Sequence, residues 1–251
     1  MNVLVCVKRV PMTGGKIVLT DDERAISTRH LGFTVSPHEE CGVEEAVRVV
    51  EQHGGSSTVL TLGPAEAEEQ LRDMMAIGAD RAIHLVTDGG EWDPQATAAA
   101  IVAAINADSE GYDLILFGNE SADAGNYQVP IRVAHTLGLA CVTGVKAISV
   151  QGGQVRCEQE VTGGRDVYVV PTPAVVSVKE GINLPRYPSV PGRLRAKRKP
   201  LGSSTPQRPD PRLEMLRLKL PAGASKRTQV LGTGPDAAPA VVEVLREIGV
   251  L

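Results

Sequence analysis

The chain has 251 residues, of which 42% are hydrophobic and 22% are charged, and this composition is typical of a globular protein with a sizeable buried core. The formal net charge of −4 argues against a general nucleic-acid binder, whose surface is usually strongly basic. No apolar run approaches the ~20 residues needed to span a bilayer, and the opening "MNVLVCVKRV" is too short an apolar stretch for a signal peptide, so we expect no direct membrane insertion.

The four cysteines are Cys6, Cys41, Cys141 and Cys157, and they form neither a CxxC pair nor another metal-ligand spacing. The five histidines also lack metal-binding or catalytic spacing. We therefore predict buried free thiols in a reducing compartment, a cytoplasmic protein and no metal site.

Strand and helix patterns alternate along the first half of the chain. Apolar runs of strand length lie at residues 2–7, 57–62, 81–86 and 113–117. Helical patterns separate them, from Ser36 onward, at 63–78 and from Asp93-Pro94 to about Ala107. This order predicts an α/β fold with a parallel, doubly wound sheet and right-handed crossovers.

The first helix has a clear start signal, because Ser36, Pro37 and Glu39 supply an N-cap, a first-turn proline and the carboxylate of a capping box. Its apolar and polar residues fall on opposite faces. The apolar face has Val43, Ala46, Val47 and Val50, and the other face has Glu44, Glu45, Arg48 and Glu51.

After residue 140 the pattern changes to short strands separated by Gly-Gly turns, which predicts an antiparallel hairpin extension, followed by a buried strand at 173–178. From about residue 181 the chain is rich in Pro, Arg and Lys, and we expect an irregular segment on a surface or a partner. Its run 193–199 has five positive charges, which fit either a solvated segment or an acidic protein partner. The closing helix near 238–251 is amphipathic and must dock on this chain or on another.

A polar loop follows the strand at 113–117. In "GNESADAGNYQVP" (118–130), glycines permit close approach of the backbone to a ligand, and N–H groups near a helix start attract phosphate. Loops at Gly63-Pro64 and 36–40 lie at the same predicted edge, which favours a nucleotide cleft over an ordinary solvated loop, although composition alone leaves both open. We identify no acid, base or nucleophile, so the sequence predicts binding rather than catalysis.

Taken together, these segments resemble the beta subunit of electron transfer flavoprotein. The resemblance spans nearly the whole chain, in "VLVCVKRVP", "SPHEECGVEEAVRV", "TLGPAEAEEQLRDMMAIGADRAIHL", "DLILFGNESADAGNYQVP", "CEQEVTGG", "PAVVSVKEGINLPRYPSVPGRLRAKRKP" and "VVEVLREIGVL". It implies an adenine-nucleotide-binding-like fold, a structural AMP, and a heterodimer with a larger alpha subunit that holds most of the FAD. It further implies an electron carrier with no catalysis of its own. Electrons would pass from flavin dehydrogenases, such as the acyl-CoA dehydrogenases of fatty acid beta-oxidation, toward a membrane quinone oxidoreductase.

The resemblance also assigns residues. Glu160 matches an acid near the flavin at the subunit interface. The loop 183–200 matches a partner-recognition loop, in which Val190 occupies the position of an aliphatic anchor and Pro185, Arg186, Tyr187 and Pro191 surround it. We expect a domain 1–204 that includes this loop, and a C-terminal arm 205–251 whose helix docks on the alpha subunit. The AMP pocket is expected at Cys6, Ser36, Pro37, His38, Glu39, Leu62, Gly118, Asn119, Glu120, Ser121, Ala122, Asp123, Ala124, Gly125, Asn126, Tyr127, Gln128 and Val129.

Two alternatives stay open. Bifurcating relatives bind a second FAD in place of AMP and oxidise NADH, but their Asn-Pro-x-Asp segment and Asp-Gly-Asp-Thr-type loop are matched poorly by residues 36–39 and 123–126. A stand-alone adenine-nucleotide sensor is usually shorter and has no reason to carry the segment 181–251. AMP in an electron carrier is the interpretation that these residues favour.

Overall fold

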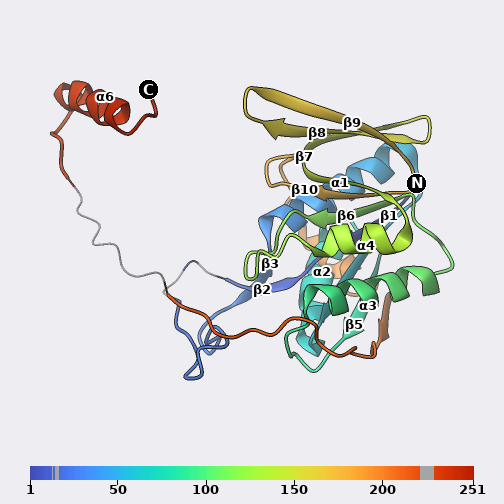
Figure 1. Cartoon of the computed structure of the whole chain (residues 1–251). Helices are drawn as coiled ribbons and strands as arrows, with labels where there is room; N and C mark the ends of the chain where they lie inside the picture. The colour runs from blue at the N-terminus through green and yellow to red at the C-terminus, as the bar shows by residue number, and fades with distance from the viewer. Residues whose placement is uncertain (13, 15–16, 221–228) are drawn as a thin grey trace.

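The computed structural model describes residues 1–12, 14, 17–220 and 229–251, and its centre is one large sheet (Figure 1). The described strands of this sheet lie in the order β11-β5-β4-β1-β6-β10-β7-β8-β9. Seven run parallel: β1 (Asn2–Cys6), β4 (Ser56–Gly63), β5 (Arg81–Val86), β6 (Leu114–Gly118), β7 (Ala140–Gln151), β10 (Ala174–Val178) and β11 (Leu201–Ser204). The doubly wound parallel fold predicted from the sequence is therefore confirmed.

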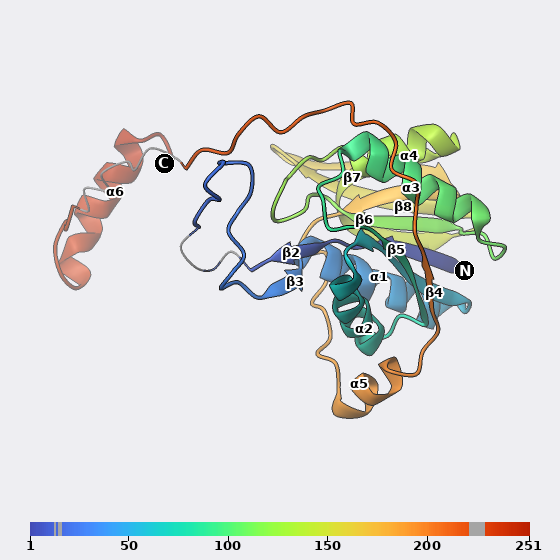
Figure 2. The same ribbon diagram turned by 90° about the horizontal axis from the view of Figure 1, so that it is seen from below.

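Helices cover both faces of the sheet (Figure 2). On one face lie α1 (Pro37–His53) and α2 (Glu68–Ile77), which follows the 3-10 turn η1 (Ala65–Ala67), and on the other lie α3 (Pro94–Ala107) and α4 (Val129–Leu137). Alternate residues of β1 serve the two layers, because Val3 and Val5 pack toward α1 and α2 while Leu4 and Cys6 pack toward α3 and α4. Burial on both faces explains why β1 and β6 are continuous apolar runs.

The predicted hairpin extension is present. Strands β8 (Gln154–Val161) and β9 (Gly164–Pro171) pair antiparallel at the end of the sheet, and β8 pairs antiparallel with β7. The strand expected at 173–178 is β10, which returns to the sheet between β6 and β7. The residues of β9 are almost all exposed, so this outer strand is left without a covering layer by the described chain.

The expectation of an irregular segment after residue 181 is wrong in part. Helix α5 (Val190–Ala196) begins where the Ser189 hydroxyl accepts the Gly192 N–H at 3.1 Å, and β11 then joins the edge of the sheet beside β5. A seven-residue helix with five exposed residues has no apolar periodicity for the sequence to show. The small antiparallel ribbon of β2 (Arg9–Pro11) and β3 (Phe33–Val35) was not predicted either, because each strand has only three residues.

The cysteine prediction needs one correction. All four cysteines are free, and Cys6, Cys41 and Cys157 are buried, but Cys141 is exposed. Cys141 lies near the start of β7, where its side chain alternates away from the buried Val142.

The C-terminal arm behaves differently from the body. Its first part lies on the body, because the Arg212 and Leu213 N–H groups donate to Asp93 Oδ2 at 2.6 and 3.2 Å. The last helix, α6 (Ala238–Glu247), follows the 3-10 turn η2 (Pro235–Ala237), has no buried residue and lies apart from the sheet in Figure 1. The division at residue 204 stays a prediction. Among the described helices, none is sufficiently long and apolar to cross a membrane.

Candidate functional site

The order of the strands reverses between β1 and β6. From β1 the chain passes through α1 to β4 on one side, and it later returns through α3 to β6 on the other side. Cys6, the last residue of β1, pairs in register with Leu60 and Phe117, so the carboxyl ends of three strands meet here. Doubly wound sheets bind ligands at such a reversal, and the loop 118–128 starts at this edge.

Glu39 fixes the local geometry of this edge. Its side chain is only 6% exposed, and its Oε2 accepts the N–H groups of Lys8 at 3.0 Å and Ser36 at 3.4 Å. Burial raises the pKa of Glu39 to about 8, although these hydrogen bonds act to lower it. The carboxyl group therefore ties the end of β1 to the start of α1.

Gly118 allows this close packing. A Cβ atom at residue 118 would lie 2.6 Å from Cγ of Glu39 and 3.2 Å from Cβ of His38. Because no side chain fits in that space, β6 can lie against the first turn of α1 only with glycine at its end.

The loop after β6 presents its backbone to the edge. Gly125 and Tyr127 have φ values of 56° and 57°, in the left-handed region, and Gln128 returns to the right-handed region. Alternation of this kind aims successive N–H groups toward one side and forms concavities that bind anions. Helix α4 then begins with Val129-Pro130, and no described side chain caps its first turn. Because Pro130 has no N–H and the Arg132 N–H donates to the Gln128 carbonyl, the Val129 and Ile131 N–H groups are the ones available to a ligand.

Two polar side-chain contacts surround this backbone. Lys8 Nζ lies 2.7 Å from Asp123 Oδ2, and His38 Nε2 lies 3.3 Å from Glu120 Oε1. The Glu180 N–H donates to His38 Nδ1 at 2.7 Å, which leaves Nε2 as the nitrogen that faces Glu120. Burial acts to raise the pKa of Asp123, but the Lys8 ammonium and nearby hydrogen bonds lower it overall.

Asn119 has a structural role at the same edge. It is buried, its N–H donates to the Val178 carbonyl at 2.9 Å, and its Oδ1 accepts the Ser177 hydroxyl at 3.2 Å. The same hydroxyl oxygen accepts the Gly144 N–H at 3.2 Å. This network fastens the carboxyl ends of β6 and β10 to the first half of β7.

The other residues that the sequence predicts for the AMP pocket differ in how accessible they are. Cys6 is buried, and both its burial and the nearby Glu39 raise the pKa of its thiol, so the thiol is unreactive. Ser36 is fully buried, its hydroxyl has no partner among the described residues, and Leu62 packs on the core beside α3. The accessible group follows: Pro37, Ala122, Ala124, Asn126 and Tyr127 are exposed, and Ser121, Gly125, Gln128 and Val129 are half-buried.

Lys8 was not among the residues that the sequence singled out. The sequence could have indicated Lys8 by its position, two residues after the carboxyl end of β1, because that end of the strand lies at the predicted ligand edge. Glu160 is exposed near the end of β8, next to Gln159, whose amide donates to the Thr143 carbonyl at 3.0 Å. In the described residues, no cluster of ligands suits a metal ion.

The expected partner-recognition residues lie on another surface, around α5. Tyr187 and Val190 are 98% and 72% exposed, and Pro191 is exposed next to them. Leu184 and Leu194, which the sequence did not suggest, add exposed apolar surface to this patch. Arg186 and the half-buried Pro185 differ from them, since the Arg186 guanidinium turns inward to Glu44 and Glu51 on α1.

Comparison with known proteins gives a consistent result. A family model described as "Electron transfer flavoprotein domain" matches residues 25–206. The electron transfer flavoprotein subunit beta of Bacillus subtilis is 34% identical over 201 residues, which cover 80% of this chain and 77% of that protein. The Syntrophomonas wolfei protein of the same name is 36% identical, with 88% and 86% of the two chains covered. That of Bradyrhizobium diazoefficiens is 33% identical, with 100% of both chains covered. On this evidence the chain belongs to the electron transfer flavoprotein family, as a beta subunit.

Proposed function

We propose that this chain binds AMP at the edge between β1 and β6 and, with a larger alpha subunit, encloses the FAD of a heterodimeric electron carrier. The observation that supports AMP most strongly is the turn at 125–128, where left-handed residues lead into the uncapped start of α4. Together with Lys8, this backbone provides the N–H donors and the positive charge that a phosphate requires.

The ion pair of Lys8 fits the same interpretation. Lys8 has a carboxylate partner in Asp123, at a position where a bound phosphate would compete for the ammonium group. The side chains of Asn126 and Gln128 extend the hydrogen-bonding surface toward a ribose, and both reside in the loop that forms the edge. The buried Cys6 and the half-buried Leu62 belong to the same apolar cluster, which suits an adenine ring better than a charged group.

The FAD is expected mainly in the alpha subunit, where it supplies the electron-transfer chemistry. The contribution of this chain is to hold and shield it, with Glu160 on the exposed end of β8 facing the interface and the arm 205–251 lying on the partner. The patch around Val190 would dock flavin dehydrogenases such as acyl-CoA dehydrogenases, and a quinone oxidoreductase would accept the electrons. Free thiols fit a cytoplasmic location.

Purified heterodimer carrying Lys8→Gln tests the proposal. Lys219→Gln is the matched control, because Lys219 is an exposed lysine of the arm, away from the edge. We expect Lys8→Gln to release AMP on gel filtration while the FAD content and the heterodimer persist, and Lys219→Gln to retain AMP. Equal AMP retention by both variants would exclude the phosphate site at Lys8. A second FAD in place of AMP, with NADH oxidation, would instead indicate a bifurcating subunit.

A further inference from the structure

The polar face of α1 is covered near Glu44 and Glu45, while Arg48 and Glu51 on the same face remain exposed. Glu44 and Glu45, which the sequence places on that polar face, are only 2% and 9% exposed, so the expectation of a simple amphipathic helix is wrong there. The chain from Ile182 to Arg186 covers them. A buried carboxylate is costly without partners, and these two obtain their partners from the covering segment.

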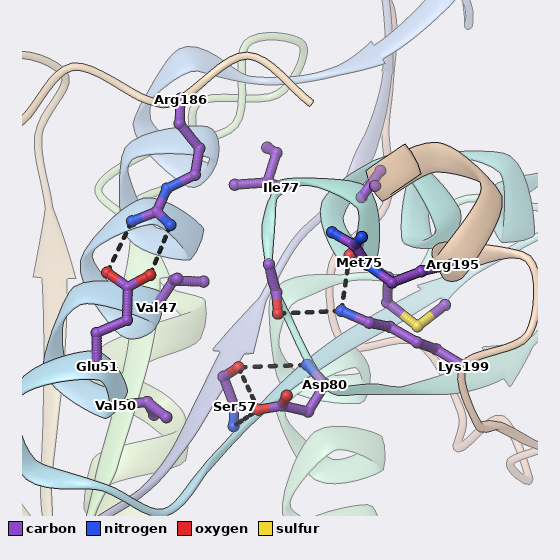
Figure 3. A pocket seen from close by; sticks show the side chains of 13 residues that line it. Val47, Val50, Glu51, Ser57, Met75, Ile77, Asp80, Arg186, Arg195 and Lys199 are labelled. Carbon is purple, nitrogen blue, oxygen red and sulfur yellow. Dashed lines mark hydrogen bonds and ion pairs between the residues drawn. The ribbon is translucent and has the colours of Figure 1, made fainter. Parts of the chain in front are cut away.

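Arg186 supplies most of these contacts, and it also pairs with Glu51, as Figure 3 shows. Its Nε and its own backbone N–H donate to Glu44 Oε2 at 2.9 and 3.1 Å, and Nη2 donates to Glu44 Oε1 at 3.1 Å. Nη1 and Nη2 also donate to the two carboxylate oxygens of Glu51, at 2.7 and 3.0 Å. One guanidinium thus bridges two carboxylates that lie two turns apart on α1.

Asn183 adds a second attachment to the same helix. Its amide nitrogen donates to the Cys41 carbonyl at 3.0 Å and to Glu45 Oε2 at 2.9 Å. The segment between Asn183 and Arg186 is therefore fastened to α1 at both ends, while Leu184 between them remains exposed.

The far end of the patch is fastened to α2. Lys199 Nζ donates to three carbonyls at the end of α2, those of Met75, Gly78 and Ala79, at 3.0, 3.1 and 2.7 Å. In return, Arg72 of α2 donates to the carbonyls of Ala196 and Lys199, both at 2.9 Å. A hollow of about 340 Å³ remains between α1, α2 and α5, and Arg186, Arg195 and Lys199 line it (Figure 3).

Two of the three cations that line this hollow are already occupied by the chain's own groups. Arg186 is taken by two carboxylates and Lys199 by three carbonyls, so the hollow is better explained by fastening of the segment than by binding of an anion. The hydrogen bonds that Arg186 donates to Glu51 and then to Glu44 raise the pKa of Arg186. Burial acts to raise the pKa of Glu44, but the hydrogen bonds that it accepts from Arg186 and Arg48 lower this pKa overall.

We propose that Arg186 is a positioning residue for partner docking: its bridge to Glu44 and Glu51 holds residues 183–189 on α1, so that Tyr187 and Val190 project in a fixed arrangement. The inference rests on the proposed function, because it takes the exposed patch to be the surface that a flavin dehydrogenase recognises. Arg186 would hold the segment in place, whereas the exposed residues around it would contact the partner, because the guanidinium of Arg186 faces α1.

Arg186→Lys is the informative substitution. Lysine keeps the charge and the aliphatic stem, but its single ammonium group cannot span both carboxylates as the planar guanidinium does. Arg48→Lys is the matched control, because Arg48 also pairs with Glu44, at 2.8 Å, but makes no contact with the segment 183–189. Glu51→Gln, at an exposed position, weakens the bridge without removing the partner of the buried Glu44.

Two measurements on the purified heterodimer test the inference. Hydrogen exchange of the backbone amides of 183–189 is expected to be faster in Arg186→Lys than in wild type or Arg48→Lys. Electron transfer from an acyl-CoA dehydrogenase, reduced with its acyl-CoA substrate, is expected to show a KM for the dehydrogenase raised about tenfold in Arg186→Lys, with kcat changed less than about twofold. Glu51→Gln is expected to shift both in the same direction by a smaller factor.

The two levels of the inference can fail separately. If wild-type heterodimer accepts electrons but Arg186→Lys and Arg48→Lys have the same KM and the same exchange rates, Arg186 does not position the segment. If exchange accelerates while KM stays at the wild-type value, the bridge is structural only and the proposal is overturned. If wild-type heterodimer accepts no electrons from the dehydrogenase, the proposed docking function itself is wrong.

Discussion

The body of the molecule buries its apolar residues, whereas the last helix buries none of its own. In the body, apolar strands such as β1 and β6 are buried between two layers of helices, with Leu4, Val5 and Leu116 fully enclosed. Helix α6 has an equally clear apolar face, but none of its residues is buried, and Val241 is 43% exposed. An amphipathic helix gains little from folding without a surface to cover.

This difference separates what the chain stabilises by itself from what it leaves for a partner. The body contains its own core and the edge at which we propose that a nucleotide binds. The exposed face of α6 is explained if the alpha subunit covers it. Four predictions can break or sharpen this division, and the main effect that each expects decreases in size from the first to the last.

Deletion of residues 229–251 is expected to abolish the heterodimer and leave the body folded. The deleted part has no buried residue in α6, so the body loses no core contacts. Copurification with a tagged alpha subunit measures the first effect, and thermal unfolding of the isolated chain measures the second. A truncated chain that still copurifies in full amount would show that the arm is not the main attachment.

Substitutions in the two regions should differ in their effect on the isolated chain. Leu116→Ala removes a fully buried side chain from the core between the sheet and α1, and we expect it to lower the free energy of unfolding by about 2–5 kcal/mol. Val241→Ala in α6 is expected to change it by less than about 0.5 kcal/mol. Urea unfolding checks both, and a large loss from Val241→Ala would mean that α6 packs on the body.

The pH dependence of stability should reveal the buried Glu39. Its pKa of about 8 in the folded chain lies above its ordinary value of 4.5. Between these two pH values the folded chain keeps the proton of Glu39, whereas the unfolded chain loses it. The stability contributed by this group is therefore present at low pH and is lost as the pH rises toward 8. Glutamine does not titrate, so Glu39→Gln should not lose this stability as the pH rises. The free energy of unfolding of the variant, relative to that of wild type, should therefore increase by about 2–4 kcal/mol between pH 5 and pH 8.

Urea unfolding at several pH values measures this difference. Glutamine retains an oxygen that can accept the Lys8 and Ser36 N–H groups, so the geometry at the end of β1 is preserved. A constant difference between the two proteins from pH 5 to pH 8 would show that Glu39 is ionised in the folded chain.

Val190→Ala should have a small effect, and only on partner docking. The exposed side chain loses two carbons, which corresponds to about 1 kcal/mol of lost burial if a dehydrogenase covers it. The KM for the dehydrogenase should rise several-fold while the FAD content is unchanged. Val18→Ala, at a similarly large and exposed valine, is the control. Loss of FAD in Val190→Ala would place this residue at the flavin instead of the docking surface.

Much of the fold was predictable because local signals agreed with the global one. The capping residues Ser36 and Asp93 precede helices that begin at Pro37 and Pro94, and Gly78 follows the end of α2 as expected. Helix α5, strand β11 and the ribbon of β2 and β3 were missed. These elements are short, and long-range pairing with α2, β5 or each other defines them, so no periodicity in the sequence indicates them.

The candidate site was predictable in location but not in mechanism. The loop 118–128 stood out by its composition, yet the buried network of Asn119, the carboxyl of Glu39 and the pairing of Lys8 with Asp123 depend on residues far apart in the sequence. The same limit applies to Arg186. The family resemblance placed it among the docking residues, whereas its partners, Glu44 and Glu51, lie 142 and 135 positions away in the sequence.

The central claim is that this chain keeps a mononucleotide at its own sheet edge while the alpha subunit supplies the flavin. Its most direct test is to denature the purified heterodimer and identify and quantify by mass every nucleotide that is released. The account predicts one AMP and one FAD for each heterodimer. Two FAD molecules per heterodimer, or FAD without any adenine mononucleotide, would contradict it.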